Sequence, residues 1–506
     1  MTEHNGRRHF LGLAVAAAGL TACGRTSGPA AQSDPAPAPA PVPSASPEPA
    51  ENDRPGTADW TVTAPGPARA IEGYADRVSV LPGEPLGLHV STTAAAFTVS
   101  AHRMGWYGGA RARLVWKSGP IPGAARPGPT VDQGTRTVRA DWPRSTTVDT
   151  TGWPEGSYLL RLDAVDAPGQ RFVPVTVRSR ATAGRVVLVN AVATWQAYNE
   201  WGGYSLYNGP TGGYATRSME VGFDRPYQYD HGAGLFLVYE APLIALAERL
   251  GLPLAHVTGV DIAREPGLLL GATAVVSLGH DEYWSDEQRR HVTTARDAGT
   301  NLAFLGANCC YRRVRYEPSA LGSDRTVVCW KSAYQDDPGF RAGRPATTDF
   351  RSGPGADPES SLLGVSYDGY PVDAPYVVGD PDHWLLAGTG ARAGDSFPHL
   401  VGVEYDRVPP DTAPPGPIEI VSRSPVVCEG RRSHADSAYY TVPGGAGVFA
   451  TGTMRWVEAL DANGPGGGRA DHGMDRRAGA FTRQVTENLL RAFAAGPAGR
   501  QHPVGA

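Results

Sequence analysis

Short apolar runs that alternate with helical patterns from residue 184 onwards constrain the fold most. Residues 185–190 read Arg-Val-Val-Leu-Val-Asn, a continuous apolar run typical of a strand buried on both faces. At 243–250 leucine and alanine recur at helical spacing before a glycine, and Ser285 precedes a helix with acidic residues in its first turn. Further strands are expected at 254–258, 272–278, 302–305 and 447–452, and a closing helix at 478–494.

Strand–helix–strand alternation of this kind predicts a doubly wound parallel sheet. We assign it to residues 183–498 and expect an amidotransferase- or flavodoxin-like arrangement. Residues 310–445 are rich in loops and contain scattered strand patterns, so we expect them to form β-rich insertions in this domain.

The preceding region, residues 58–182, has a different pattern. Short β-type runs alternate with turn signals, and no helical period is present. Runs at 77–80, 86–90, 97–102, 158–162 and 172–177 are typical of short antiparallel strands. The spacing predicts an antiparallel β-sandwich of the immunoglobulin-like type.

The N-terminal segment resembles an export signal rather than part of the fold. Arg7 and Arg8 precede a short apolar stretch, as in twin-arginine signals, and the Leu-Thr-Ala-Cys tetrad that ends at Cys23 resembles a bacterial lipobox. We expect residues 1–23 to be a lipoprotein signal, with Cys23 carrying the lipid. An ordinary secretory signal is the alternative. Residues 24–57 are rich in proline and alanine and predict a disordered linker to the outer face of the cell membrane.

Composition narrows the classes of partner. The net charge of −5 argues against a nucleic-acid-binding protein, which needs a basic face to neutralise phosphates. Beyond the N-terminus no apolar run reaches the roughly 18 residues of a membrane helix. The membrane is therefore expected as a partner only through the lipid.

Four cysteines remain after Cys23, namely Cys309, Cys310, Cys329 and Cys428. Their spacing matches no zinc-binding pattern. In an exported protein a disulfide is the default expectation, and one of the adjacent Cys309 and Cys310 can pair with Cys329. We expect a Cys310–Cys329 bond with Cys428 free. A cysteine nucleophile is the alternative.

Polar side chains follow three of the expected strands. Tyr198 comes after the first strand, His280 and Glu282 after the third, and Asn308 after the fourth. In open parallel sheets, ligands bind outside the carboxyl ends of the strands. The three segments therefore predict one site at one edge of the sheet. The alternative is that each residue caps a helix or satisfies loop backbone.

The residue types suggest a metal. The chain has no Gly-x-Ser-x-Gly, His-Glu-x-x-His or phosphate-binding Walker motif. The turn at 279–285 has the strand–turn–helix form of a nucleophile elbow, but carries His280 and Asp281 where a serine or cysteine would stand. Glutamate and tyrosine oxygens are hard ligands that suit a Lewis-acid metal able to activate water.

Several long segments resemble one family. They are Thr-Trp-Gln-Ala-Tyr-Asn-Glu-Trp-Gly-Gly at 194–203, Phe-Asp-Arg-Pro-Tyr at 223–227, Gly-His-Asp-Glu-Tyr-Trp-Ser at 279–285, 301–308, 447–449 and Thr-Met-Arg-Trp at 453–456. Over about 184–495 the chain resembles the C-terminal domain of the N,N-dimethylformamidase large (beta) subunit. Residues 71–116 resemble the β domain that precedes it in that family.

The resemblance implies a single iron held by two tyrosines and a glutamate, with a histidine and an asparagine nearby. Carried over, Glu282 is the carboxylate ligand and Tyr198 one phenolate. For the second phenolate, Tyr239 is the first choice and Tyr204 the alternative. His280 then acts as the acid/base and Asn308 orients or polarises the substrate. The family's amidase also uses a small partner subunit, for which this chain shows no fused equivalent.

Two functions follow from these observations. The first is a metal-dependent hydrolase at the cell surface that cleaves a small amide or similar C–N bond, with iron, expected as Fe³⁺, as Lewis acid. A small subunit or a homo-oligomer is the expected protein partner. The second is a non-catalytic lipoprotein that uses the same scaffold to bind a ligand, a glycan or a partner protein.

Overall fold

The computed structural model describes residues 50–410, 416–461 and 472–505. The export signal, Cys23 and the linker up to residue 49 lie outside the described residues. The described part belongs to one compact unit, Pro49–Ala506. Among the described residues no helix is both long enough and apolar enough to cross a membrane.

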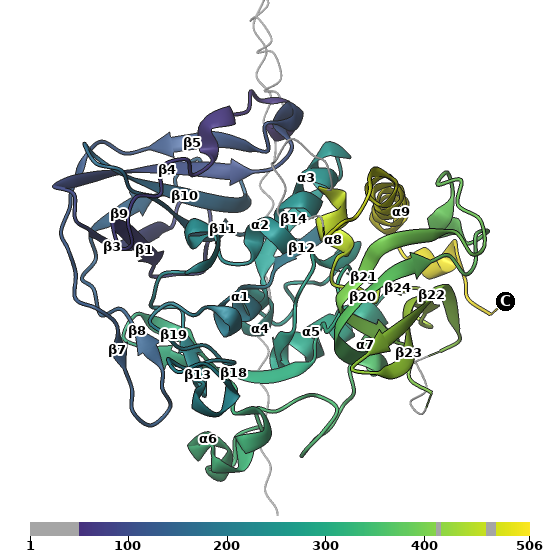
Figure 1. Ribbon diagram of the computed structural model, residues 1–506. Helices are drawn as coiled ribbons and strands as arrows, with labels where there is room; N and C mark the ends of the chain where they lie inside the picture. The colour runs from purple at the N-terminus through teal and green to yellow at the C-terminus, as the bar shows by residue number, and fades with distance from the viewer. Residues whose placement is uncertain (1–49, 411–415, 462–471, 506) are drawn as a thin grey trace, which may run out of the picture. The chain divides into compact units, whose positions relative to one another are not determined.

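The N-terminal part consists of two β-sheets around a common core (Figure 1). One sheet contains β1 (Ile71–Ala75), β3 (Pro85–Thr92) and β9 (Thr146–Asp149). The other contains β2 (Ser79–Val80), β11 (Gln170–Val177), β10 (Gly156–Ala164), β4 (Ala96–Met104) and β5 (Ala112–Lys117), and β6 (Ile121–Pro122) pairs with β4. Alternate side chains of both sheets, such as Leu88 and Leu160, meet in one buried cluster. Alternation along each strand therefore produces the sandwich.

A seven-stranded sheet forms the centre of the second part. Its order is β14 (Leu254–Thr258), β12 (Val186–Asn190), β15 (Ala274–Ser277), β17 (Asn301–Phe304), β24 (Gly447–Ala450), β23 (Arg431–Thr441) and β22 (Ile418–Cys428). The first five strands are parallel to one another, β23 runs antiparallel to β24, and β22 runs antiparallel to β23. The parallel prediction holds for the strands that carry the site, and the sheet as a whole is mixed.

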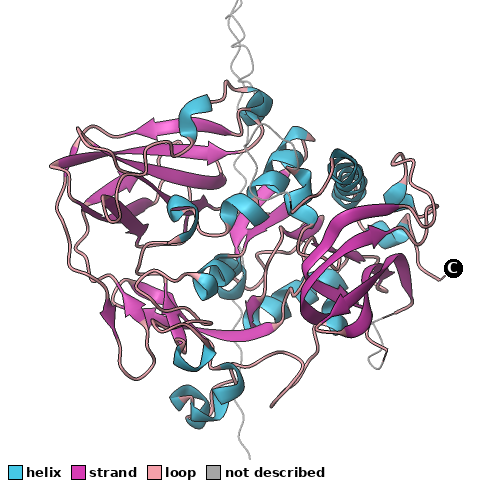
Figure 2. Cartoon of the chain, in the orientation of Figure 1, coloured by secondary structure: helices cyan, strands magenta, loops and turns pink. Residues whose placement is uncertain are grey.

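Helices cover both faces of this sheet (Figure 2). In β12, Val186 and Leu188 face a cluster that includes α1 (Val192–Tyr198), α3 (Ala241–Arg249), α8 (Trp456–Leu460) and α9 (Arg476–Ala494). Val187 and Val189 face the opposite cluster with α4 (Gly259–Arg264), α5 (Asp286–Asp297) and α7 (Ser360–Leu363). A strand buried on both faces must be apolar at every position, which explains its continuous apolar run.

Two β-rich insertions extend this core. Strands β13 (Glu220–Gly222), β19 (Gly322–Val328), β18 (Arg312–Ser319) and β16 (Tyr283–Ser285) form a four-stranded sheet. The long strands β20 (Ser366–Val377) and β21 (Ser396–Arg407) form an antiparallel hairpin. The fold also contains four short elements, namely β7 (Thr130–Val131), β8 (Val138–Arg139), α2 (Phe236–Tyr239) and α6 (Pro338–Arg341).

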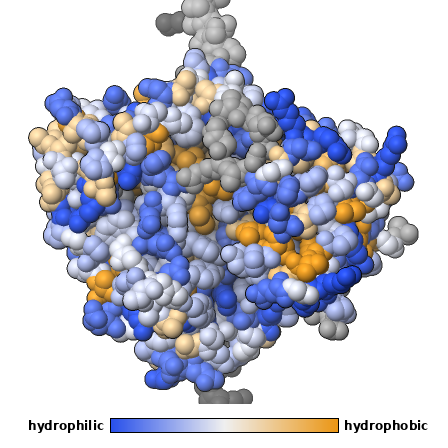
Figure 3. All heavy atoms as spheres, in the orientation of Figure 1, coloured by the Kyte–Doolittle hydropathy of each residue, from blue (hydrophilic) through white to orange (hydrophobic). Residues whose placement is uncertain are grey.

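The prediction of an α/β part plus a β part is confirmed. The immunoglobulin-like and amidotransferase- or flavodoxin-like assignments are finer and stay predictions. The two parts share a core, because Met104 and Leu159 of the sandwich belong to the same buried cluster as Leu188. The surface seen in Figure 3 is mostly hydrophilic, with apolar patches of limited extent.

The expected linker ends earlier than residue 57. Residues Glu51–Asp53 form a short 3-10 helix, and Glu51 accepts hydrogen bonds from Tyr107 and Arg113 of the sandwich. The Asn52 side chain donates to the backbone carbonyl of Glu248 in α3. These contacts pack the segment that follows Ala50 against the folded part of the chain.

The expected Cys310–Cys329 disulfide is absent in the structure. Cys309, Cys310, Cys329 and Cys428 are all free and buried. Cys310 lies in the cluster on the α5 face, with its sulfur 3.5 Å from Nη1 of Arg289. Cys329 belongs to the other cluster. The two thiols face different sides of the fold, which proximity in sequence alone does not reveal.

Candidate metal-binding active site

The three predicted segments meet at the carboxyl edge of the parallel strands. Tyr198 ends α1, which follows β12, and His280 and Glu282 lie in the loop between β15 and β16. Asn308 lies in the loop after β17. Two glycines allow these loops to approach. A Cβ at Gly279 would collide with the carbonyl of Tyr239, and one at Gly306 with the carbonyl of Gly279. The backbone therefore needs glycine on both sides of the site.

Three side-chain oxygens converge on one point. The Tyr198 hydroxyl donates to Oε2 of Glu282 at 2.7 Å. The Tyr207 hydroxyl lies 2.9 and 2.8 Å from Oε1 and Oε2 of the same carboxylate. The two hydroxyl oxygens are 3.1 Å apart. Two phenols and one carboxylate thus form a triangle of oxygens in a buried environment.

Burial sets the protonation state of this triangle. Burial raises the pKa of the phenols of Tyr198 and Tyr207 well above their usual range, and the nearby Glu282 carboxylate raises it further. In the structure both phenols donate hydrogen bonds to Glu282. Tyr283 donates to the Tyr207 hydroxyl at 2.8 Å and completes the hydrogen-bonding around it.

Cationic side chains border the triangle. Nε of Arg312 lies 3.4 Å from Oε1 of Glu282. Nζ of Lys331 lies 3.4 Å from the centre of the Tyr207 ring and donates to the carbonyl of Leu206 at 2.9 Å. Burial lowers the pKa of Lys331 to about 7. Lys331 therefore fixes the loop that carries Tyr207.

A second carboxylate faces the site across His280. Nε2 of His280 is 3.7 Å from Oε2 of Glu282, and Nδ1 is 3.8 Å from Oε2 of Glu404 in β21. Burial lowers the pKa of His280, which leaves the imidazole neutral near pH 7. Burial, and then the Glu282 carboxylate, raise the pKa of Glu404, while the Asn308 side chain lowers it. The site thus places two carboxyl groups around a neutral imidazole.

The structure places a different tyrosine, Tyr207, beside Glu282. Tyr207, and not Tyr239, contacts Glu282. The Tyr239 ring lies beside His280, with ring centres 5.8 Å apart. Tyr204, the alternative, packs in a separate cluster near Trp201. Tyr207 lies in the loop after Tyr198, and nothing in the sequence distinguishes it from Tyr204 in the same loop.

Glu404 and Arg312 were missed as well. Glu404 is buried in β21, a strand of the inserted hairpin, and sequence alone does not show that this strand reaches the site. Asp281, which lies between His280 and Glu282, has a different partner. It accepts a hydrogen bond from the Ser277 hydroxyl at 3.2 Å.

Two features of the site fit a bound cation. Oxygens that share one small cation lie about 3 Å apart, and the triangle has edges of this length. In addition, both ring nitrogens of His280, Oδ1 of Asn308 and Oε2 of Glu404 are buried without a well-directed hydrogen bond to the described residues. Such orphaned atoms in a native site call for a ligand, a water or an ion. No group of three or more His, Cys, Asp and Glu in the described residues could hold a metal, so the fit depends on the tyrosines.

Comparison with known families identifies the family of the chain. The model of the family described as N,N-dimethylformamidase beta subunit-like, C-terminal, matches residues 98–470. This range covers well over half of the chain. The chain belongs to this family. No curated protein matches the chain. The match includes Tyr198, Tyr207, Glu282 and Glu404, and begins inside the sandwich, before the α/β part of the N,N-dimethylformamidase-like chain.

Proposed function

We propose that this N,N-dimethylformamidase-like chain is an iron-dependent hydrolase that cleaves a small amide or a similar C–N bond. The observation that carries the proposal is the oxygen triangle of Tyr198, Tyr207 and Glu282, with His280 and Asn308 beside it. Hard oxygen donors of this kind prefer a hard cation such as Fe³⁺.

Tyr198, Tyr207 and Glu282 would hold the iron. When bound, the ion would supply Lewis acidity that polarises an amide carbonyl and makes water more acidic. The two phenols would give up their protons, because a neighbouring cation lowers the pKa that burial and Glu282 now raise. A cation would also relieve the repulsion between the carboxylates of Glu282 and Glu404.

His280 handles the proton in this proposal. Its neutral imidazole accepts a proton from the attacking water at one ring nitrogen and donates it to the departing amine. Glu282 and Glu404 lie against its two nitrogens at 3.7 and 3.8 Å, so the charged imidazolium is stabilised from both sides. Asn308 directs its unpaired Oδ1 to a substrate N–H or a water. Burial of the site excludes bulk water and strengthens each of these interactions.

The proposal also includes where the enzyme is located in the cell and which protein partner it has. We place the enzyme at the outer face of the cell membrane, attached through a lipid on Cys23, on the basis of the Arg7-Arg8 pair and the Leu-Thr-Ala-Cys tetrad. Because the family is described by a beta subunit, a small subunit or a second copy of the chain is the expected protein partner.

A substrate screen tests the activity. The full exported chain is loaded with iron and incubated with small primary, secondary and tertiary amides, including formamides, and the released amine is measured. We expect hydrolysis of at least one small amide that depends on iron. Iron-loaded protein that hydrolyses none of them would favour the non-catalytic alternative.

A further inference from the structure

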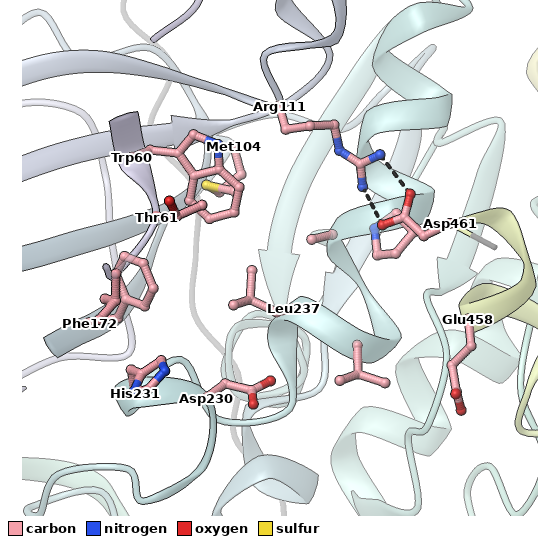
Figure 4. Close-up of a pocket in the computed structure, with 14 residues that line it drawn as sticks. Trp60, Thr61, Met104, Arg111, Phe172, Asp230, His231, Leu237, Glu458 and Asp461 are labelled. Atoms are coloured by element: carbon pink, nitrogen blue, oxygen red, sulfur yellow. Dashed lines mark hydrogen bonds and ion pairs between the residues drawn. The ribbon is translucent and has the colours of Figure 1, made fainter. Parts of the chain in front are cut away.

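A cavity of about 220 Å³ lies between the sandwich and the α/β part, away from the oxygen triangle. Its walls come from β4 and β11 of the sandwich, from the segment before β1, and from α2, α3 and α8 of the α/β part. Figure 4 shows Trp60 and Phe172 on one side, Glu458 on the opposite side and Asp230 between them. This volume is enough for a small organic molecule.

Aromatic rings form one wall of this junction cavity. The rings of Trp60 and Phe172 have centres 6.3 Å apart and are tilted by 33°. The indole nitrogen of Trp60 donates to the carbonyl of Ala110 at 3.0 Å, which fixes the ring. Leu237 adds apolar surface between the rings and the acidic side. The wall therefore places two aromatic rings beside the cavity.

Acidic side chains form the other wall. Asp461 is neutralised by Arg111, whose Nη1 and Nη2 lie 2.7 and 2.9 Å from its two oxygens. Glu458 lies 2.9 Å from Nδ1 of His472, and burial raises its pKa to about 7. Asp230 is buried and lies in the left-handed region of the backbone, with a φ of 54°. The side chains of Asp230 and Glu458 also line the cavity.

The junction cavity is separated from the candidate active site by Tyr239. Val238, directly before Tyr239, lines the cavity, while the Tyr239 ring lies beside His280. Glu458 of the cavity and Glu404 of the site both act on the Tyr239 phenol, after burial, to raise its pKa. Tyr239 is therefore a wall between two compartments.

We propose that the junction cavity binds an alkylammonium cation, with its alkyl groups against Trp60 and Phe172 and its charge near Glu458 and Asp230. Aromatic faces attract organic cations through the ring quadrupole, and carboxylates close the opposite side. An alkylammonium also adds an electrostatic attraction to the Glu458 carboxyl group beside its His472 partner, which an uncharged ligand of the same shape does not. The proposal does not depend on hydrolase activity.

Calorimetric titration of the full chain at pH 8 tests this binding. The probe is choline, and the matched neutral probe is 3,3-dimethylbutan-1-ol, in which carbon replaces the nitrogen. We expect choline to bind about tenfold more tightly than the alcohol, in the range of a desolvated cation–π pair supported by a carboxylate. Equal affinity for the two probes would overturn the proposal.

Variants locate the binding in the cavity. Glu458→Gln should weaken choline about fivefold without affecting the alcohol, and Trp60→Leu should weaken choline by a similar factor. Asp382→Asn, on the exposed surface, is the control and should change neither. Circular dichroism confirms that each variant is folded, and the isosteric Glu458→Gln decides the outcome if Trp60→Leu unfolds. Unchanged choline affinity in Glu458→Gln would overturn the proposal.

A further variant separates this cavity from the oxygen triangle. Choline binding should persist in Glu282→Ala, because Glu282 lies on the other side of Tyr239. Loss of binding in Glu282→Ala would place the cation at the oxygen triangle and overturn the proposal. If the chain binds choline but hydrolyses no amide, the proposed cation binding in the junction cavity is supported and only the hydrolase proposal is contradicted.

Discussion

Replacing Tyr207 by phenylalanine tests the proposal that Tyr198, Tyr207 and Glu282 bind iron. The Tyr207 hydroxyl contacts both oxygens of Glu282 at 2.9 and 2.8 Å, and also the hydroxyls of Tyr198 and Tyr283. Tyr207→Phe removes one of three protein oxygens from the triangle. Loss of a residue that only supports a ligand weakens metal binding about 10- to 100-fold, so loss of the ligand itself should cost about 100-fold or more.

The same substitution affects the metal-free protein. Glu282 loses one of its donors in a buried environment, which should destabilise the fold by about 1–3 kcal/mol. Tyr239→Phe is the matched control, because the Tyr239 ring lies beside His280 without contacting Glu282. Urea unfolding at pH 7 measures the loss of stability in both variants.

Iron titration followed by visible spectroscopy measures the effect on binding. Ferric phenolate gives a charge-transfer band, so colour reports the tyrosine ligands directly. We expect Tyr239→Phe to retain iron and the band, and Tyr207→Phe to lose both. A Tyr207→Phe protein that binds iron with wild-type affinity and colour would refute the assignment of Tyr207 as a ligand. Loss of the band in Tyr239→Phe alone would indicate that Tyr239 is the second tyrosine ligand.

Three further predictions follow. His280→Ala should keep iron but lower the rate of amide hydrolysis by about 10²-fold or more, as measured by steady-state kinetics; an unchanged rate would remove its acid/base role. Cys23→Ala should leave the protein exported but absent from the membrane fraction, as shown by fractionation and immunoblotting, and retention there would contradict lipid attachment. Hydrogen bonding to His256 and the Arg103 guanidinium outweigh burial and hold the pKa of Glu248 at about 2, below the 4.5 of a free side chain. This lowered pKa contributes about 3 kcal/mol of stability above pH 4.5, which is lost as the pH falls towards 2. In urea unfolding, the difference in unfolding free energy between wild type and Glu248→Gln should therefore narrow from pH 4.5 to pH 2. A constant difference would contradict the prediction.

Much of the fold could be predicted because local patterns decide it. Val186–Asn190 must be a strand buried on both faces, since a continuous apolar run has no other place in a compact fold. Ser285 accepts a hydrogen bond from the backbone N–H of Gln288, as its position before α5 predicted. The pairing of the antiparallel strands β22 and β23 with the central sheet was not predicted, because the partners of these strands are set by tertiary contacts.

The site likewise contains residues that the sequence predicts and residues that it does not. Tyr198, His280, Glu282 and Asn308 follow strands of one parallel sheet, and the rule that parallel strands end at a common edge brings them together. Tyr207 and Glu404 obey no such rule, because a loop and an inserted hairpin carry them to the site. The expected Cys310–Cys329 bond failed for a related reason, since closeness along the chain does not determine which face a thiol occupies.

Iron content tests the central claim most directly. The full chain is reconstituted with ferric iron, freed of excess metal, and analysed by elemental analysis beside Glu282→Gln, which keeps the shape of the side chain but removes its charge. The proposed triangle predicts about one iron per chain in the wild type and far less in Glu282→Gln. Wild-type protein without iron, or Glu282→Gln with a full equivalent, would contradict the claim that Tyr198, Tyr207 and Glu282 form an iron site.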